Sequence, residues 1–378
     1  MDFDYSEEQR LLDETVRRLV KDEYEFAKRK NYLAEPRGFS AALWSRYAEL
    51  GLLGLPFAEE YGGFGGGGIE TMIVMEGLGR GLALEPYLAT VVLGGGLVAL
   101  AGNDAQKSAI LPEISAGNLK LAFAQSERSA RYDLAAVESS ARPQGGGFVL
   151  NGHKSVVLHG GVADKLIVSA RTAGSPRDES GLSLFLVDRD AKGVAVHEYP
   201  TVDGLRAADI VLSDVAIGSD ALLGPRDGAL PLIVRASDCA VAAVCAEAVG
   251  IMETLNAMTL DYIKTRKQFG VPIGSFQVLQ HRMVDMTIAA EQAKSMEILA
   301  AMSIDSDDRR EREKAVSAAK VQIGLSGRLV GQQAIQLHGG IGMTDEYAAG
   351  HYFKRLASIE HSFGDTDYHL DRFPAFPD

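Results

Sequence analysis

Cysteine and metal-binding patterns are scarce in this chain. Its 378 residues include two cysteines, Cys239 and Cys245, and both fall within an apolar helical pattern. So few cysteines in a chain of this length argue against a disulfide framework and fit buried thiols in a reducing compartment. The histidines are scattered without metal-ligand spacing, so we predict no bound metal.

Positive charge and long apolar runs are scarce as well. The formal net charge is −13, which argues against a nucleic-acid partner because phosphate binding needs a basic face. The longest charge-free run, residues 86–103, contains three consecutive glycines, and we interpret it as a buried helix-loop segment and not as a membrane span. The acidic first residues lack the basic and apolar regions of a signal peptide, so we expect a cytoplasmic protein.

The first third of the sequence is predicted to be helical. Ser6 is suited to cap a helix, and apolar residues at helical spacing follow it. A loop further on contains Gly63, Gly65 and Gly68 in the pattern GxGxxG. No strand is predicted before this loop, so we interpret it as a connection between helices and not as a dinucleotide-binding motif.

The predicted secondary structure changes twice along the rest of the chain. Between residues 120 and 217, short β-rich runs are separated by glycine, asparagine and aspartate, which predicts a small all-β domain. Within it, residues 148–150 are predicted to be a strand that enters a hairpin turn at Asn151-Gly152. Long helical periodicity then returns, and short links between the helices predict an antiparallel bundle. The helices are expected at 230–264, 276–302, 309–337 and 345–360.

Two short motifs near helix ends carry most of the functional information. They are Arg266-Lys267-Gln268-Phe269-Gly270 and the segment 336–342, Gln-Leu-His-Gly-Gly-Ile-Gly. Each combines polar groups suited to a pyrophosphate with glycines that allow a backbone to approach a ligand closely. Together they resemble the acyl-CoA dehydrogenases, FAD enzymes that remove two hydrogens from a fatty acyl thioester.

The resemblance covers essentially the whole chain and implies an α+β fold in three domains. An N-terminal all-α domain is expected at 1–118, a middle β-barrel or sandwich domain at 119–228, and a C-terminal four-helix bundle at 229–378. It also implies FAD as cofactor, an acyl-CoA substrate, an electron-transfer flavoprotein as electron acceptor, and either a homotetramer or an α2β2 heterotetramer. The ending Phe363-Gly364-Asp365-x-Asp367 resembles a subgroup whose members include subunits of dehydrogenases for steroid side-chain or dicarboxylic acyl-CoAs, such as pimeloyl-CoA.

The resemblance also implies where FAD is held. In the family, an arginine offers a planar fork to phosphate oxygens of a neighbouring subunit's cofactor, and a phenylalanine offers an apolar face to the adenine end. The β-domain holds the isoalloxazine ring, although this chain has Val156 and Leu158 where a tryptophan and a threonine usually lie. The residues expected to contact FAD are Phe123, Gln125, Ser126, Val156, Leu158, Arg266, Gln268, Phe269, Ile273, Phe276, Gln277, Gln336, His338, Gly339, Gly340 and Thr366.

Two positions in the flavin-facing segment depart from the family. Residues 126–133 resemble its Thr-Glu-Pro-x-x-Gly-Ser-Asp segment, but Arg131 replaces the glycine and Tyr132 replaces the serine. We predict that these two side chains contact the substrate. His338 has an alternative reading as an ordinary histidine of the helix bundle.

The catalytic base is the largest departure from the family. Dehydrogenation across Cα and Cβ needs a carboxylate to take the α-proton. The usual glutamate position corresponds to Gly364, and a second position used by some members corresponds to Ala240. The candidates in this chain are Glu247, two helical turns beyond Ala240 in apolar surroundings, and Asp365. The alternatives for Glu247 are a buried glutamate satisfied by an arginine or a backbone amide, or a glutamate at a subunit contact. The alternative for Asp365 is a helix cap.

These departures leave three functions open. The first is an FAD-dependent acyl-CoA dehydrogenase in which this chain supplies its own base. The second is a non-catalytic subunit that shares FAD with a separate catalytic chain. The third is another flavin reaction on the same scaffold, such as oxidation by oxygen or thioester desulfination.

Overall fold

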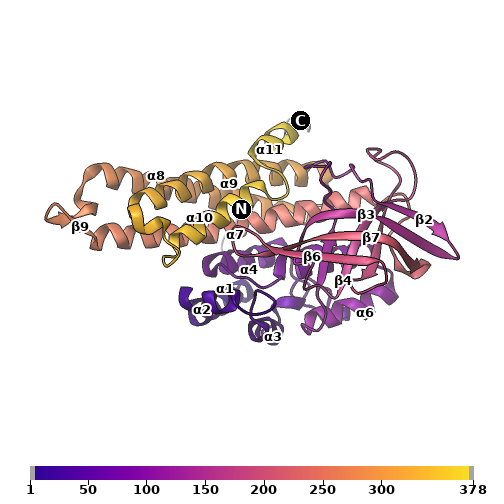
Figure 1. Cartoon of the computed structure of the whole chain (residues 1–378). Coiled ribbons are helices and arrows are strands. Elements are labelled where there is room, and N and C mark those ends of the chain that lie inside the picture. The colour runs from indigo at the N-terminus through magenta and orange to yellow at the C-terminus, as the bar shows by residue number, and fades with distance from the viewer. Residues whose placement is uncertain (1–4, 374–378) are drawn as a thin grey trace. The chain divides into compact units, whose positions relative to one another are not determined.

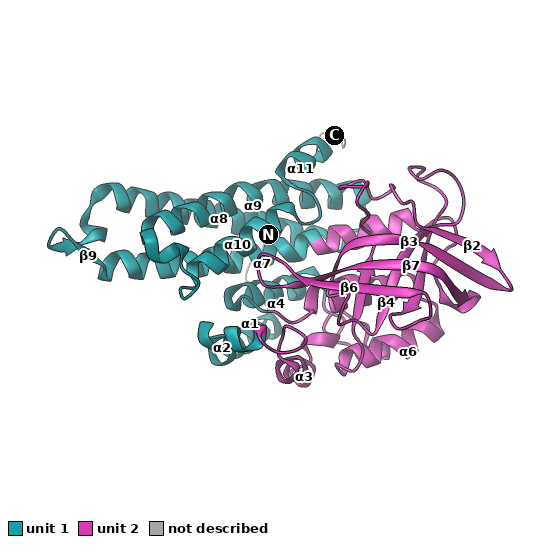
Figure 2. Cartoon of the chain, in the orientation of Figure 1, with its two compact units in different colours: residues 1–32, 67–83, 241–378 teal, residues 33–66, 84–240 magenta. Residues whose placement is uncertain are grey.

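The computed structural model describes residues 5–373 (Figure 1). Chain contacts divide it into two compact units, which Figure 2 shows in different colours. We call residues 33–66 and 84–240 the sheet unit, and residues 1–32, 67–83 and 241–378 the helical unit. The boundaries of these two units differ from those of the three predicted domains. The predicted domain boundaries at 118/119 and 228/229 therefore remain a prediction.

The sheet unit combines short helices with one eight-stranded sheet. Its helices and helical turns are α3 (Ala41–Glu49), η1 (Leu52–Gly54), η2 (Glu59–Tyr61), the π-helix η3 (Leu88–Gly95), α5 (Gly96–Ala101), α6 (Asp104–Ser115) and η4 (Ser219–Ala221). Its strands are β1 (Leu121–Ala124), β2 (Ser140–Gln144), β3 (Gly147–Leu158), β4 (Lys165–Arg171), β5 (Leu182–Asp188), β6 (Val194–Pro200), β7 (Arg206–Gly218) and β8 (Leu222–Leu223). The charge-free run at 86–103 forms η3 and α5 and is largely buried.

The strands pair in the order β6-β7-β3-β2-β4-β5-β8, and β1 pairs with β4 in parallel. The neighbours β6-β7, β7-β3, β3-β2, β4-β5 and β5-β8 are antiparallel. A buried core lies under the sheet, where the rings of Phe148 and Phe185 pack with their centroids 5.0 Å apart. This arrangement confirms the predicted β-rich middle domain.

The predicted hairpin turn at Asn151-Gly152 is wrong. β3 runs through both residues, and the strand pairing with β7 shifts register between Leu150 and Gly152. The hairpin between β2 and β3 turns instead at Gly145 and Gly146, whose φ values are 60° and 84°. Two consecutive positive φ angles define the tight turn that matches strand twist, and glycine adopts them without steric cost.

The helical unit contains the long helices of the chain. Its helices are α1 (Glu7–Glu23), α2 (Phe26–Leu33, which ends at the unit boundary), α4 (Gly68–Gly81), α7 (Leu230–Thr265, which enters the unit at Val241), α8 (Gln277–Ser303), α9 (Arg309–His338), α10 (Ala349–His361) and α11 (Thr366–Arg372). Shorter elements are the strands β9 (Lys267–Gln268) and β10 (Val271–Pro272) and the turns η5 (Ile273–Ser275) and η6 (Gly339–Met343). The four long helices predicted from periodicity are therefore confirmed as α7 to α10, with α10 starting a turn later than expected.

The ends of the first helices follow local chemistry. Ser6 accepts a hydrogen bond from the Gln9 backbone N–H, and the Gln9 side chain accepts one from the Ser6 N–H, which together form a capping box. The glycine-rich segment leads into α4 without a preceding strand, as predicted. At the start of α4, the Gly68 N–H donates to the Asp305 carboxylate at 2.7 Å.

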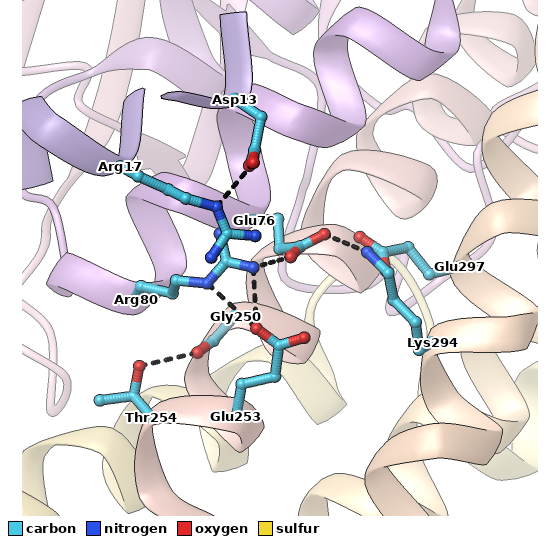
Figure 3. A network of polar contacts seen from close by, with 9 residues as sticks. All are labelled: Asp13, Arg17, Glu76, Arg80, Gly250, Glu253, Thr254, Lys294 and Glu297. Atoms are coloured by element: carbon cyan, nitrogen blue, oxygen red, sulfur yellow. Dashed lines mark hydrogen bonds and ion pairs between the residues drawn. The ribbon is translucent and has the colours of Figure 1, made fainter. Parts of the chain in front are cut away.

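A largely buried polar network links three helices of this unit, α4, α7 and α8 (Figure 3). Arg80 of α4 forms ion pairs with Glu76 of the same helix and with Glu253 of α7. Lys294 of α8 pairs with Glu76 and with Glu297, the latter at 3.1 Å. Burial raises the pKa of Glu297 well above its ordinary value, with the Glu76 charge adding to the effect. Paired charges inside the unit fix the helices relative to one another.

Neither a spanning helix nor a metal cluster occurs in the part of the chain that the structure describes. No helix within residues 5–373 has the length and apolar character needed to cross a bilayer. Within the same residues, no group of three or more histidine, cysteine, aspartate or glutamate side chains could hold a metal ion.

Candidate functional site

The motif at 266–270 forms an exposed hairpin at the end of α7. Lys267 and Gln268 form β9, which pairs with β10, and Phe269-Gly270 is the two-residue turn between them. Phe269 has φ 55°, an uncommon conformation for an aromatic residue, and its side chain is 93% exposed. The turn therefore holds an apolar ring in solvent, where only another molecule can cover it. Ile273, Phe276 and Gln277 follow along η5 and into α8.

The second motif lies at the same end of the helical unit. The ring of His338 at the end of α9 packs against Tyr262 of α7, with centroids 4.6 Å apart. Near the start of α8, Arg282 donates a hydrogen bond to Gln333 of α9 at 3.2 Å. The structure therefore brings the two predicted FAD motifs to one end of the bundle.

The individual residues of the second motif differ in their surroundings. Gln336, Gly339 and Gly340 are exposed, and a Cβ added at either glycine would meet nothing within 4 Å among the described residues. His338 is buried, with Nδ1 2.8 Å from the Ala334 carbonyl and Nε2 3.1 Å from the Tyr347 hydroxyl. These contacts favour the bundle-histidine reading, and burial lowers the pKa of His338.

The sheet unit brings the predicted flavin-facing residues of β1 and β3 together. Phe123 lies in β1, and Gln125 and Ser126 follow it directly. The backbone N–H of Ser155 in β3 donates to the Ser126 carbonyl at 2.8 Å. Val156 and Leu158 follow on β3, and Val156 is 55% exposed.

A buried ion pair fixes this junction. Lys154 of β3 is fully buried, and its Nζ donates to Glu127 Oε1 at 2.7 Å and to Ser169 Oγ at 3.0 Å. Glu127 also accepts hydrogen bonds from the backbone N–H groups of Glu138 and Ser139. Burial lowers the pKa of Lys154 to about 8, although the Glu127 charge opposes this. This pair has no local signal in the sequence, because Glu127 and Lys154 are 27 residues apart in the chain.

Arg131 and Tyr132 lie in the loop after β1. Arg131 is exposed and has φ 51°, a left-handed conformation at a position where the family has glycine. The backbone at Arg131 therefore has the left-handed conformation that glycine favours, although the residue carries a long side chain. Substrate contact by Arg131 and Tyr132 remains a prediction.

Gly364, the usual base position, lies in a closed turn between α10 and α11. Its φ is 108°, and an added Cβ would lie 2.3 Å from Tyr368 Cδ1 and 2.7 Å from His369 Nε2. The fully buried Lys320 of α9 donates to the Glu360 carbonyl at 3.0 Å and to the Gly364 carbonyl at 2.5 Å. No side chain fits at position 364 in this turn, so the absence of the glutamate does not leave an open cavity.

Asp365 and Thr366 take part in the same turn. Asp365 Oδ1 accepts a hydrogen bond from the Tyr368 backbone N–H at 2.9 Å and caps α11. Thr366 is buried, and its hydroxyl donates to Glu360 Oε1 at 2.7 Å. Both side chains thus have structural partners inside this chain, and their predicted roles in catalysis and FAD binding remain untested predictions.

Glu247, the other candidate base, is paired with an arginine. Its Oε1 accepts from Arg355 Nε at 2.6 Å, and its Oε2 accepts from Arg355 Nη2 at 2.7 Å. Glu247 and Arg355 are 7% exposed each. A bidentate pair holds the carboxylate in one orientation. Glu247 can act as a base only if it leaves Arg355, so the arginine-paired alternative has direct structural support.

The residues expected to hold FAD fit a ligand of that kind. In the sheet unit, Gln125 Oε1 and Ser155 Oγ are buried and have no hydrogen-bond partner among residues 5–373. Buried polar atoms are normally satisfied, so these two are candidates for contacts to a ligand. In the helical unit, the exposed Phe269 ring and the open space at Gly339 and Gly340 offer an apolar face and close backbone approach.

Sequence comparison identifies the family. Residues 6–118, 122–215 and 238–373 match the N-terminal, middle and C-terminal domains of acyl-CoA dehydrogenases, respectively. The chain belongs to the acyl-CoA dehydrogenase family, whose members are FAD-dependent oxidoreductases acting on the CH–CH group of acyl-CoA. Its fold has the helical, β-rich and helical domains of that family in order.

Individual relatives agree with this assignment. The chain is 30% identical over 372 residues to the probable acyl-CoA dehydrogenase YngJ of Bacillus subtilis, covering 97% of each chain. It is similar to a chain of the ChsE4-ChsE5 complex from Mycobacterium tuberculosis, with 26% identity, TM-score 0.89 and coverage of 99% and 98%. The FAD complex of PigA is 25% identical, with TM-score 0.92 and coverage of 99% and 98%.

Proposed function

We propose that this chain takes part in the α,β-dehydrogenation of an acyl-CoA thioester as a subunit of an FAD-containing oligomer. The observation that supports this is the single end of the bundle at which Arg266, Phe269 and Gln336 are all exposed beside Gly339 and Gly340. A guanidinium, an aromatic face and an open glycine turn suit the pyrophosphate and adenine of FAD bound to a neighbouring copy. In this reaction FAD supplies the acceptor for the hydride that leaves Cβ.

Within this chain, Glu247 is the proposed base for the α-proton. It is a buried carboxylate on α7, the helix on which the family resemblance places an alternative base, whereas Asp365 is occupied as a helix cap. For this role the carboxylate must break its hydrogen bonds to Arg355 and face the α-carbon of the substrate when an acyl-CoA binds. The freed carboxylate would then have to lie within hydrogen-bond reach of the α-proton that it removes.

Substitution of Glu247 by Gln tests this role. We expect loss of turnover by at least about 100-fold with FAD retained, because general base catalysis contributes factors of this size. Glu253→Gln is the matched control, since Glu253 lies on the same helix and is also paired with an arginine, Arg80. Turnover unchanged by Glu247→Gln would overturn the assignment of the base.

A second function with specific support is that of a non-catalytic member of an α2β2 heterotetramer. Both carboxylate oxygens of Glu247 are held by Arg355, and the turn at Gly364 is filled by Tyr368 and His369. The similar ChsE4 and ChsE5 chains form a complex with each other. Copurification from the native host discriminates the two functions. A homotetramer with one FAD per chain favours a complete enzyme, and a second chain with FAD in a ratio below one per chain favours the partner subunit.

Further assignments rest on the family. We propose a tetrameric assembly, an electron-transfer flavoprotein as acceptor, and a place in fatty acid or lipid degradation. A cytoplasmic location is supported by the two cysteines, Cys239 and Cys245, which form no disulfide within residues 5–373. Bleaching of the flavin absorbance by members of an acyl-CoA panel tests the reaction. A flavoprotein that none of them bleaches would argue against the dehydrogenase.

A further inference from the structure

A second register shift interrupts β3 next to the predicted flavin-facing residues. Lys154 pairs with Ile210 of β7, and Val157 pairs with Ala208. Ser155 and Val156 therefore lie opposite the single residue Asp209, which is the arrangement of a β-bulge. Bulges are enriched next to active sites because they redirect side chains and backbone groups.

The bulge holds Val156 in an unusual conformation. Its φ is 55°, which is a clear outlier for a β-branched residue. Its side chain is 55% exposed, so packing against other side chains does not enforce this shape. Such a backbone persists only where surrounding contacts determine it, and it is frequent at ligand sites.

Asp209 supplies the contact that determines it. Asp209 Oδ1 accepts a hydrogen bond from the Val156 backbone N–H at 3.2 Å and another from the Tyr199 hydroxyl at 2.9 Å. His153 Nε2 and Arg128 Nη2 lie 3.7 Å and 3.9 Å from Oδ2. Burial alone would raise the pKa of Asp209, yet the hydrogen bonds from Tyr199 and Val156 bring it below its ordinary value.

The same bulge is tied to the other flavin-facing segment. Ser155, the first bulged residue, donates its backbone N–H to Ser126, and its buried hydroxyl lacks a partner among residues 5–373. A displacement of the bulge would therefore move Ser126 and the Ser155 hydroxyl together with Val156. The three residues form one backbone unit whose shape depends on an acceptor at position 209.

We infer that Asp209 is a positioning residue for the flavin, because its carboxylate fixes the Ser155-Val156 bulge in the shape that receives the isoalloxazine ring. This inference rests on the proposed function, which assigns FAD to this chain. It makes no use of the acyl substrate or of the base. Asp209 acts through the backbone of β3, so its removal changes how FAD is held without removing a group that touches FAD.

Titration of the apoprotein with FAD, followed by quenching of flavin fluorescence, tests the inference. Asp209→Ala removes the acceptor, and we expect the Kd for FAD to rise at least about tenfold, as for the loss of a charge-assisted hydrogen bond. We also expect a changed visible absorbance and circular dichroism spectrum of the flavin that remains bound. Asp209→Asn keeps an acceptor oxygen and should stay within about threefold of wild type.

Asp214 offers a matched control on the same strand. It lies on β7 and accepts a hydrogen bond from Asn151 at the other register shift of β3. Asp214→Ala should leave the Kd and the flavin spectrum unchanged. Equal, wild-type-like values for Asp209→Ala and Asp214→Ala would overturn the inference. Failure of the wild-type protein to take up FAD in any assembly would instead overturn the proposed function and this inference with it.

A rescue variant separates positioning from general stability. Glycine adopts φ near +55° without steric cost, so Val156→Gly should restore FAD binding to Asp209→Ala at least in part. If Asp209→Ala does not fold, Tyr199→Phe removes one hydrogen bond to Asp209 and keeps the other. A measurable spectral shift of the flavin in Tyr199→Phe supports the inference. An unchanged flavin spectrum and Kd in Tyr199→Phe contradict it.

Discussion

Two regions of the helical unit differ in how far their family-motif residues are exposed to solvent. At the hairpin end, Phe269 is 93% exposed and Gly340 has nothing within 4 Å of an added Cβ. Around α10, Glu247 and Arg355 pair with each other, and Tyr368 and His369 fill the space at Gly364. The hairpin end is open to a ligand or another chain, whereas side chains of this chain fill the space around α10.

The difference teaches which part of the family's machinery this chain retains. The exposed ring and the open glycine turn add little to folding stability and remain available to a ligand or a partner. Closed, mutually satisfied groups contribute to folding, and Glu247 reaches a substrate only if Arg355 releases it. The comparison therefore favours cofactor binding at the hairpin end and a region around α10 whose pairing must open before it can act on a substrate.

Removal of Arg355 should give the largest effect. Arg355→Met leaves the buried Glu247 carboxylate without its partner, and we expect a loss of about 3–5 kcal/mol in the free energy of unfolding. Urea denaturation measures it. Arg328→Met is the control. The Arg328 side chain pairs with Glu360 but is 58% exposed, so this substitution should cost below about 1 kcal/mol. Equal losses in the two variants would remove the contrast between open and closed regions.

Filling the closed turn should cost somewhat less. Gly364→Ala combines a left-handed backbone with a clash against Tyr368 and His369, so we expect a loss of about 2–4 kcal/mol. Gly340→Ala at the hairpin end should cost below about 1 kcal/mol, since the added methyl group meets open space. Thermal unfolding of both variants tests this pair. A stable Gly364→Ala protein would show that the turn can open.

The pH dependence of stability should report on His369. Burial and the neighbouring Lys320 charge lower the pKa of His369 to about 3, so this ring stays neutral in the folded protein while it is protonated in the unfolded chain below about pH 6.5. The unfolded state then binds more protons, and stability falls as the pH falls. Between pH 6.5 and 5, wild type should lose about 2 kcal/mol more than His369→Gln. Parallel stability profiles for the two proteins would contradict the buried neutral histidine.

Truncation of Phe269 should have the smallest effect on folding. Phe269→Ala removes an exposed ring, and we expect a change in unfolding free energy within about 0.5 kcal/mol. The same variant should bind FAD several-fold more weakly, because base stacking on an aromatic face is worth about 1–3 kcal/mol. Urea denaturation measures the first effect and flavin content the second. A large loss of stability with unchanged flavin content would reverse the proposed roles of the two regions.

Elements governed by local signals could be predicted. The capping box at Ser6, the four long helices and the loop before α4 all depend on residues close together in sequence. The motif at 266–270 is predicted only as a cofactor-binding segment, and its hairpin is seen first in the structure. Asn151-Gly152 shows the limit of this approach, because pairing of β3 with β7 keeps it within a strand and Gly145-Gly146 supplies the turn.

The candidate site depends on partners that sequence spacing does not reveal. Arg355 lies far from Glu247 along the chain, so its presence beside a predicted base had no local signal. Lys320 and His369 similarly close the turn around Gly364 from two different helices. An apolar context correctly indicated that Glu247 is buried, but burial alone did not distinguish a base from an ion pair.

The left-handed conformation of Arg131 has a consequence for engineering. Glycine at that position would relieve about 1–2 kcal/mol of steric cost, so Arg131→Gly is an expected thermostabilising substitution. Because the Arg131 guanidinium is exposed and predicted to contact the substrate, the same substitution should raise the melting temperature and lower the activity.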